Sequence, residues 1–210
     1  MSVPDKSIDP RLLSAAKKVF LDKGFEMASL AELCQMAGVT TGALYKRYSS
    51  KEELFAEVVS GTIHEMKEYF SSLTEGDLSK LTDQELYDGF SMKAEDNLKW
   101  LRFLYDRKDE VILLIKCAAG TRYSNFHHDW SEATTRLLYK YYQEAKRRGL
   151  TSKEIPSTEM HVLAATVWTL YYEPFIHGFD WEQMEYHAET IQSFINWHRV
   201  FAMKKPDYDS

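Results

Sequence analysis

Apolar residues recur every three or four positions along most of the chain, and runs in which apolar and polar residues alternate are scarce. Recurrence at this spacing places the apolar side chains on one face of a helix. The pattern therefore predicts an all-α protein: an N-terminal three-helix domain with a helix-turn-helix, followed by a larger helical bundle. Predicted helices cover about 9–23, 29–37, 40–47, 51–72, 83–107, 109–118, 122–148, 156–177 and 181–203, and 74–82 is the expected linker.

Helix start and stop signals set these boundaries. Asp9 before Pro10 fits an N-cap followed by the first helical position, and Gly24 fits the left-handed end of that helix. Pro174 should kink or end the helix at 156–177. Capping boxes, in which two side chains satisfy free backbone N–H groups at a helix start, are expected at Ser29 with Glu32, at Ser49-Ser50 with Glu53, and at Asp180 with Gln183.

The segment from Ser29 to Lys51 carries the most information about function. Two short helices meet there at a tight turn, Ala37-Gly38-Val39, in which Gly38 fits a position of positive φ that other residues resist. A steep angle between the two helices would leave the second one projecting, in the geometry with which a recognition helix enters a major groove.

The residue types on that second helix suit DNA. Hydroxyl groups and free backbone N–H groups at a helix N-terminus bind phosphate and base edges, a glycine lets backbone approach closely, and cations neutralise phosphates. The candidate DNA-binding residues are Ser29, Thr40, Thr41, Gly42, Tyr45, Lys46, Arg47 and Lys51.

The net charge of −6 is unevenly distributed. Residues 1–51 carry eight basic and five acidic side chains, a net charge of +3, and the rest of the chain carries −9. A basic N-terminal part on an acidic remainder fits a DNA-binding module joined to a domain with another task. We expect a DNA-binding domain at residues 1–51 and an effector-binding and dimerisation domain at residues 52–210.

The N-terminal sequence resembles the TetR family of transcription regulators. The family pattern places a glycine after the first helix, Ser or Thr at the start of the second, Ala-Gly-Val in the turn, a small residue and Leu-Tyr in the recognition helix, then an aromatic and Ser-Lys-Glu-x-Leu. The matching residues are Gly24, Ser29, Ala37-Gly38-Val39, Gly42, Leu44-Tyr45, Tyr48 and Ser50-Lys51-Glu52-Glu53-Leu54, which cover about a quarter of the chain.

This resemblance implies roles for individual residues. Tyr45 and Lys51 occupy positions of phosphate contacts, and Thr41 and Gly42 occupy positions that reach base edges. Thr40 and Arg47 are expected to contact backbone or bases, and Lys46 is either a DNA contact or a solvated surface charge. The aromatic at position 48 is Tyr where Phe is commoner, and we expect it to pack inward.

Aromatic residues are abundant after residue 51, where 25 of the 29 occur. Aromatics at helical spacing can simply fill a bundle core, or they can line a site for an apolar or aromatic ligand between helices. The resemblance favours a small-molecule effector in this domain. The candidate effector-binding residues are Trp100, Tyr123, Phe126, His127, Trp130, Trp168, Tyr171 and Tyr172.

The resemblance also implies a homodimer that binds double-stranded operator DNA. Its interface is expected on the last two helices, with Ala164, Ala165 and Trp168 on one and Ala188, Ile191 and Ile195 on the other. Two recognition helices about 34 Å apart would then read two half-sites one turn apart. The expected function is that of a ligand-responsive repressor, in which effector binding shifts the helix from Lys51 and releases the operator.

Other chemistry finds little support in the sequence. There is no HExxH, Gly-x-Ser-x-Gly or phosphate-binding loop, so no catalytic residues, metal or cofactor are expected. Cys34 and Cys117 are expected to be buried, reduced thiols. The chain has neither a signal-peptide core nor a membrane-length apolar run, which favours a cytoplasmic protein without membrane contact. Two alternatives stay open: a DNA-binding adapter whose second domain binds a protein, and an all-α enzyme with a scaffold helix-turn-helix.

Overall fold

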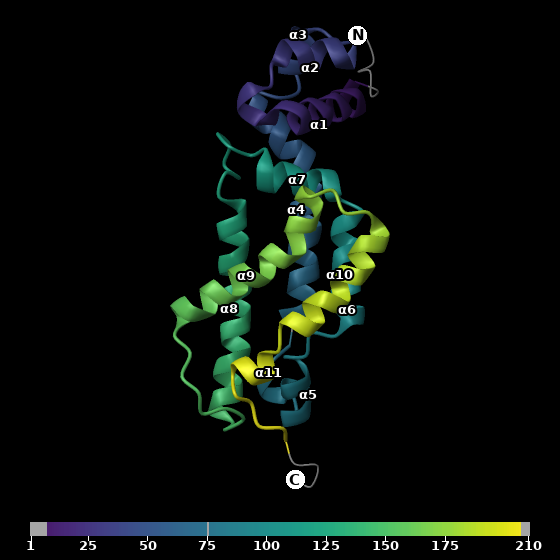
Figure 1. Ribbon diagram of the computed structural model, residues 1–210. Coiled ribbons are helices and arrows are strands. Elements are labelled where there is room, and N and C mark those ends of the chain that lie inside the picture. The colour runs from purple at the N-terminus through teal and green to yellow at the C-terminus, as the bar shows by residue number, and fades with distance from the viewer. Residues whose placement is uncertain (1–7, 75, 207–210) are drawn as a thin grey trace. The chain divides into compact units, whose positions relative to one another are not determined.

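A computed structural model of the chain describes residues 8–74 and 76–206, and every regular element in these residues is a helix (Figure 1). The all-α prediction is confirmed. None of the helices in the described residues is long and apolar enough to span a bilayer. The helices are α1 (Ile8–Met27), α2 (Leu30–Ala37), α3 (Thr41–Tyr45), α4 (Lys51–Thr74), the 3-10 turn η1 (Leu78–Lys80), α5 (Asp83–Asp88), α6 (Ala94–Tyr105), α7 (Lys108–Lys116), α8 (Phe126–Arg147), α9 (Ser157–Ile176), α10 (Trp181–Phe194) and α11 (Trp197–Val200).

The chain forms two compact units, and neither is continuous in sequence. The first, unit 1, combines the described residues up to Tyr69 with Arg107–Phe126. The second, unit 2, combines Phe70–Asp106 with the described residues from His127 onward. The expected division at residue 51 concerns function and stays a prediction; the packing shows that α7 and the segment after it belong with the N-terminal helices.

Unit 1 has a core of fully buried aliphatic and aromatic side chains. Phe20, Phe25 and Phe55 contact one another at ring-centroid distances of 5.1 to 5.9 Å. α7 packs against α1. The backbone N–H of Phe25 donates to the carbonyl of Cys117 over 2.9 Å, and Lys17 pairs with Glu110 at 2.8 Å. The hydrogen bond joins the end of α1 to the end of α7, and the ion pair joins the middle of α1 to the start of α7.

Two glycines place the turns of unit 1. Gly24 interrupts α1 with φ 74° and ψ 166°. The helix was predicted to end at this residue, but it only breaks there, and one further turn continues to Met27. Gly38 ends α2 with φ 64° and ψ 38°, in the left-handed region that glycine adopts without strain. The chain can therefore reverse sharply before α3.

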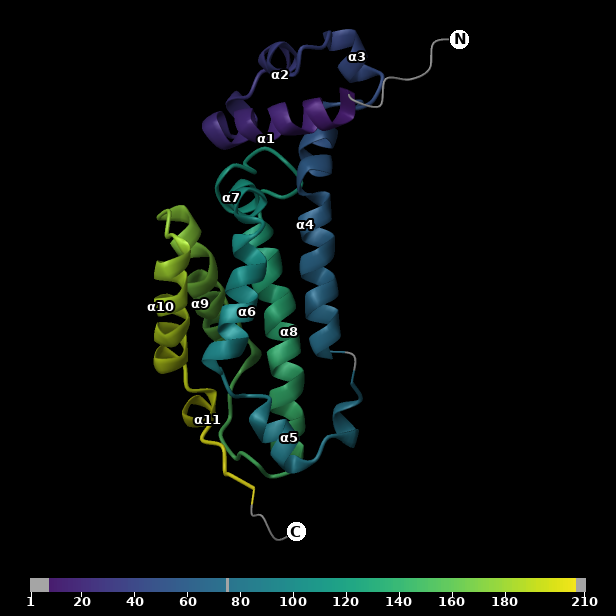
Figure 2. The same ribbon diagram turned by 90° about the vertical axis from the view of Figure 1, so that its right-hand side faces the viewer.

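In unit 2, α10 packs against α6 (Figure 2). Ring contacts join α6 to α8 and α8 to α9. Pro174 lies inside α9, which continues only to Ile176. The proline therefore stands within the last turn of the helix, as expected of a residue that limits helix propagation.

Two helices that the sequence predicts as continuous are each divided. The predicted helix 83–107 is α5 and α6, separated at residues 89–93, where Phe90 turns into a buried cluster. The predicted helix 181–203 is α10 and α11, separated at Ile195 and Asn196. The Asn196 side chain accepts a hydrogen bond from the backbone N–H of Arg199, starting α11 and bringing Phe201 into the same cluster. Burial of these rings outweighs helical continuity.

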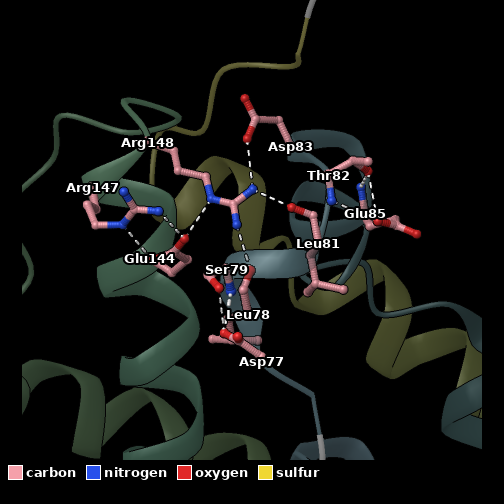
Figure 3. A network of polar contacts seen from close by, with 10 residues as sticks. All are labelled: Asp77, Leu78, Ser79, Leu81, Thr82, Asp83, Glu85, Glu144, Arg147 and Arg148. Carbon is pink, nitrogen blue, oxygen red and sulfur yellow. Dashed lines mark hydrogen bonds and ion pairs between the residues drawn. The ribbon is translucent and has the colours of Figure 1, made fainter.

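A polar network joins the end of α8 to η1 and α5 (Figure 3). The guanidinium of Arg148 donates to the carbonyls of Leu81 at 2.5 Å and Leu78 at 2.6 Å. It also pairs with Asp83 at 3.1 Å and with Glu144 at 2.7 Å. Through these bonds Arg148, whose side chain is only 12% exposed, holds the expected linker region in place.

The helix starts confirm two of the predicted capping boxes and correct the third. Asp180 and Gln183 form the expected box. At α4, the Ser50 hydroxyl accepts from the backbone N–H of Glu53 and the Glu53 carboxylate accepts from that of Ser49. The predicted box of Ser29 with Glu32 is wrong: the Ser29 side chain makes no capping hydrogen bond, and the Glu32 carboxylate pairs with Lys23 at 2.7 Å.

Two smaller predictions concern α1 and the thiols. Asp9 lies inside the first turn of α1 rather than at its N-cap, which corrects the prediction. Cys34 and Cys117 are both buried free thiols, as expected.

Candidate nucleic-acid interface

The turn between α2 and α3 is held by backbone hydrogen bonds. The Gly38 N–H donates to the carbonyl of Gln35, and the Val39 N–H donates to the carbonyl of Cys34 over 3.0 Å. The guanidinium of Arg11, on α1, donates to the carbonyl of Ala37 at 3.3 Å. A side chain of α1 thus satisfies a carbonyl at the end of α2, where the helix leaves its last carbonyls unpaired.

α3 is fixed at both of its ends. The Thr40 hydroxyl caps the helix by accepting from the backbone N–H of Ala43 at 3.2 Å. Leu44 is fully buried and anchors the helix to unit 1. At the other end, Arg47 Nε lies 2.5 Å from Asp9 Oδ1 on α1. A five-residue helix has little stability of its own, so these contacts keep α3 in one orientation.

The exposed face of α3 contains four of the predicted DNA-binding residues. Thr41, Gly42, Tyr45 and Lys46 are all exposed, and Tyr45 exposes 54% of its surface. A Cβ atom added at Gly42 would meet only the Thr40 hydroxyl, at 4.0 Å. The protein itself therefore does not require a glycine at this position, and the free space lies on the face that is expected to meet DNA.

Other predicted contacts are engaged within the protein. Lys51 Nζ donates to the carbonyls of Glu26 at 3.1 Å and Ala28 at 3.0 Å, and it lies 4.5 Å from the ring centre of Phe25. Arg47 pairs with Asp9, as described. Lys51 and Arg47 are thus bound to unit 1, and a DNA contact by either one remains a prediction that requires rotation of its side chain.

Ser29 and Tyr48 border this face. Ser29 is exposed at the N-cap of α2, and its hydroxyl makes no capping bond within the described part of the chain. Tyr48 is half-buried, consistent with the expected inward packing. Burial, together with the nearby Asp9 carboxylate, raises the pKa of Tyr48 above its ordinary value.

Sequence reasoning missed two residues that position the interface. Asp9 was assigned only to a helix start, and Arg11 was assigned no role, yet each connects α1 to the helix-turn-helix. Their spacing places both near the start of α1, one acidic and one basic. Two such charges could equally well lie exposed to solvent. Their partners are 38 and 26 residues away in the sequence, so local spacing does not indicate the contacts.

The predicted effector residues fall into three groups. Trp100, His127, Trp130, Trp168 and Tyr172 form one series of contacting rings in unit 2. Tyr171 donates its hydroxyl to Asn97 at 2.7 Å. The two others lie in the range of unit 1: Phe126 is buried, and Tyr123 contacts Phe55 at 6.3 Å. A surface recess lined by residues 90–93, 192 and 195–198 contains none of the eight.

The apolar stripes expected at a dimer interface lie mostly inside the single chain. Ala164, Trp168, Ala188 and Ile191 are each at most 2% exposed. They are therefore core residues of unit 2, which corrects the interpretation of these stripes as a subunit interface. Large apolar side chains that α9 and α10 do expose are Val162 at 58%, Tyr186 at 74% and Phe194 at 70%.

The fold and this site define a class of protein: an all-helical protein with a helix-turn-helix whose short second helix exposes hydroxyl, glycine and basic groups. Residues 12–58 match the sequence profile of the family described as bacterial regulatory proteins, tetR family. The helix-turn-helix of this chain is therefore of the TetR-family type.

Relatives and a solved structure support this assignment. The chain is 43% identical over 49 residues to the HTH-type transcriptional activator FasR of Mycolicibacterium smegmatis, covering 23% of this chain and 22% of FasR. It is 30% identical over 95 residues to the HTH-type transcriptional repressor AcnR of Corynebacterium efficiens, covering 43% and 50%. A transcriptional regulator (TerR/AcrR family) from Aquifex aeolicus has the same fold, with a TM-score of 0.60 and 19% identity over 90% of this chain and 99% of its own.

These curated relatives share only part of their length with the chain, half of AcnR and less than a quarter of FasR. The family profile matches residues 12–58, in the N-terminal part of the chain. Likeness over the whole length rests on the fold.

Proposed function

We propose that the protein is a DNA-binding transcription regulator whose affinity for its operator changes when a small molecule binds unit 2. The observation that carries this proposal is the exposed face of α3, where Thr41, Gly42, Tyr45 and Lys46 project from a helix anchored by Leu44. Reading DNA takes place in the cytoplasm of a bacterium, so a cytoplasmic location belongs to the same proposal.

The residues of α3 have distinct parts in the proposed complex. Thr41 and the free backbone N–H groups at the start of α3 face phosphate or base edges, and Gly42 permits close approach. The Tyr45 hydroxyl donates to a phosphate, and Lys46 neutralises one. Thr40 caps the helix and Arg47 holds its far end, so both act by positioning it.

The proposed regulator acts as a homodimer. An operator with two half-sites requires two recognition helices held at a fixed spacing. Exposed apolar side chains of α9 and α10, Val162, Tyr186 and Phe194, are the proposed contacts between subunits. Repression is the proposed direction of control, with release of the operator when the effector binds.

The coupling is proposed to run through unit 1 as a whole. Segment 107–126 is bonded to α1 through the Phe25–Cys117 hydrogen bond, and to α4 through Arg122 and Glu52, whose side chain accepts from the Arg122 N–H at 2.8 Å. A shift of α7 would therefore move the helix-turn-helix together with the start of α4. The factor by which the effector lowers DNA affinity equals the ratio of effector affinities for the DNA-free and DNA-bound states.

Fluorescence anisotropy with labelled DNA from upstream of the protein's own gene tests the proposal. Wild type, Lys46→Ala and Lys67→Ala are titrated over a salt series, Lys67 being an exposed lysine of α4. We expect affinity to fall steeply with salt, and Lys46→Ala to reduce the slope of log K against log salt by about 1. Lys67→Ala should match wild type. Absence of salt-dependent binding even at low salt would refute DNA binding.

A further inference from the structure

Unit 2 contains a continuous series of aromatic rings drawn from α6, α8 and α9. Trp100 stacks on Trp130 with planes 7° apart and centroids 6.2 Å apart. Trp130 contacts Trp168 at 5.7 Å, and Trp168 contacts Tyr172 at 5.5 Å. His127 meets Tyr172 edge-on at 5.2 Å. We call these five residues the aromatic series.

Trp168 has a buried donor that the described residues leave without a partner. Its side chain is 2% exposed, and its Nε1 has no hydrogen-bond acceptor among them. Buried indole N–H groups are usually paired, because an unsatisfied donor retains the full desolvation cost of leaving water. This unpaired donor lies between the rings of Trp130 and Tyr172, and a bound ligand would supply the acceptor that it lacks.

Hydroxyl groups on α8 offer no competing donor at this place. Ser131, Thr134 and Thr135 each donate to a carbonyl four residues earlier on α8, at 2.7 to 2.9 Å. Their hydrogens are committed to their own helix. The Trp168 N–H is thus a buried donor within the aromatic series that has no acceptor among the described residues.

The charge of the surroundings limits what could bind. The five residues of the aromatic series include no carboxylate, ammonium or guanidinium group. Burial lowers the pKa of His127, and the neighbouring His128 lowers it further, which favours the neutral imidazole. An anionic ligand would lose its hydration here without gaining an opposite charge, and the Glu173 carboxylate, which acts on His127, would repel it.

We propose that Trp168 Nε1 is the hydrogen-bond donor of the effector site, and that the effector is a neutral aromatic molecule with a hydrogen-bond acceptor such as a ketone oxygen. This inference rests on the proposed ligand response of the protein and adds the chemistry of the ligand. The rings supply stacking and edge contacts, and the indole N–H fixes the orientation of the ligand. His127, half-buried at one end of the series, is its least buried member.

Two isosteric probes separate the hydrogen bond from the apolar contacts. 2-Acetylnaphthalene has a carbonyl oxygen where 2-isopropenylnaphthalene has a CH₂ group, and the two are otherwise alike in size and shape. Their binding to the full-length protein is measured by isothermal titration calorimetry. We expect wild type to bind the ketone about tenfold more tightly than the hydrocarbon, as one buried hydrogen bond allows.

The variant Trp168→Phe removes the donor and keeps an aromatic ring. It should bind both probes with equal affinity and hold the hydrocarbon about as well as wild type does. Trp197→Phe is the matched control, because Trp197 is also buried, at 5% exposure, but lies in the separate cluster with Phe201. This control should keep the tenfold preference. Thermal denaturation establishes that both variants are folded.

The proposal is overturned if wild type binds neither probe, or binds both equally, or if Trp168→Phe keeps the preference. The DNA titration reports on the proposed function independently. A ketone that binds through Trp168 without changing DNA affinity would leave the ligand site standing and refute the regulatory response. If wild type without ligand does not bind DNA but keeps the ketone preference, the regulator proposal is refuted and the ligand site stands.

Discussion

Replacing Gly42 by alanine separates the requirements of the fold from those of DNA. The added Cβ would have the Thr40 hydroxyl as its nearest neighbour, at 4.0 Å, so it fits without a clash. Alanine is favoured over glycine in a helix by up to about 1 kcal/mol. Because Gly42 lies in the first turn of a short helix, the free energy of unfolding should stay constant or rise by less than that.

DNA binding should respond in the opposite direction. A methyl group on the exposed face of α3 prevents close approach of the backbone, and we expect the Kd for operator DNA to rise tenfold or more, about 1.4 kcal/mol. The slope of log K against log salt should not change, because no cation is removed.

Gly61→Ala provides the matched control for this experiment. Gly61 lies exposed within α4, and an added Cβ there would meet no described atom within 4 Å. It should gain stability in the same way and bind DNA like wild type. Anisotropy titrations and chemical denaturation of the three proteins measure both quantities. Equal DNA affinity in all three would show that Gly42 does not face the DNA.

Three further predictions concern unit 2 and the dimer. Arg148→Met should lower the free energy of unfolding by about 3 kcal/mol in urea denaturation, because hydrogen bonds from a charged donor to two carbonyls are lost; a loss below 1 kcal/mol would contradict the network's role. Hydrogen bonds from Arg147 and Arg148 lower the pKa of Glu144 from 4.5 to about 2, so its contribution is present above pH 4.5 and lost as pH falls toward 2. Glu144→Gln should therefore flatten the decline of stability across that window, and an unchanged decline would exclude Glu144 as its source. Phe194→Glu should convert a particle of twice the 24.5 kDa chain mass to a single chain in sedimentation equilibrium, with helical content kept; an unchanged mass would remove Phe194 from the interface.

Local signals in the sequence predicted the helix-turn-helix well. Gly38 acts through neighbours within five residues, so the turn at its position can be predicted from the sequence itself. The same holds for the capping box at Asp180. Where a residue's partner is close in sequence, composition and spacing are sufficient.

Long-range partners account for the errors. Glu32 meets Lys23 instead of capping α2, and Phe90 and Asn196 divide helices whose apolar pattern continues. For Lys51, whose contact with phosphate stays a prediction, the sequence could not show that its ammonium group donates to two carbonyls at the end of α1. Such choices depend on which side chains the tertiary fold brings together, and periodicity carries no information about that.

The hydrogen bond from Phe25 to Cys117 has a practical consequence for protein engineering. A segment more than ninety residues downstream completes the packing around the N-terminal helices. A fragment cut after α4 would leave the side of α1 that faces α7 exposed to water, and it should aggregate or unfold. Chimeras that join this helix-turn-helix to a different C-terminal domain must therefore include residues 107–126 as well, or replace them with a segment that packs against α1 in the same way.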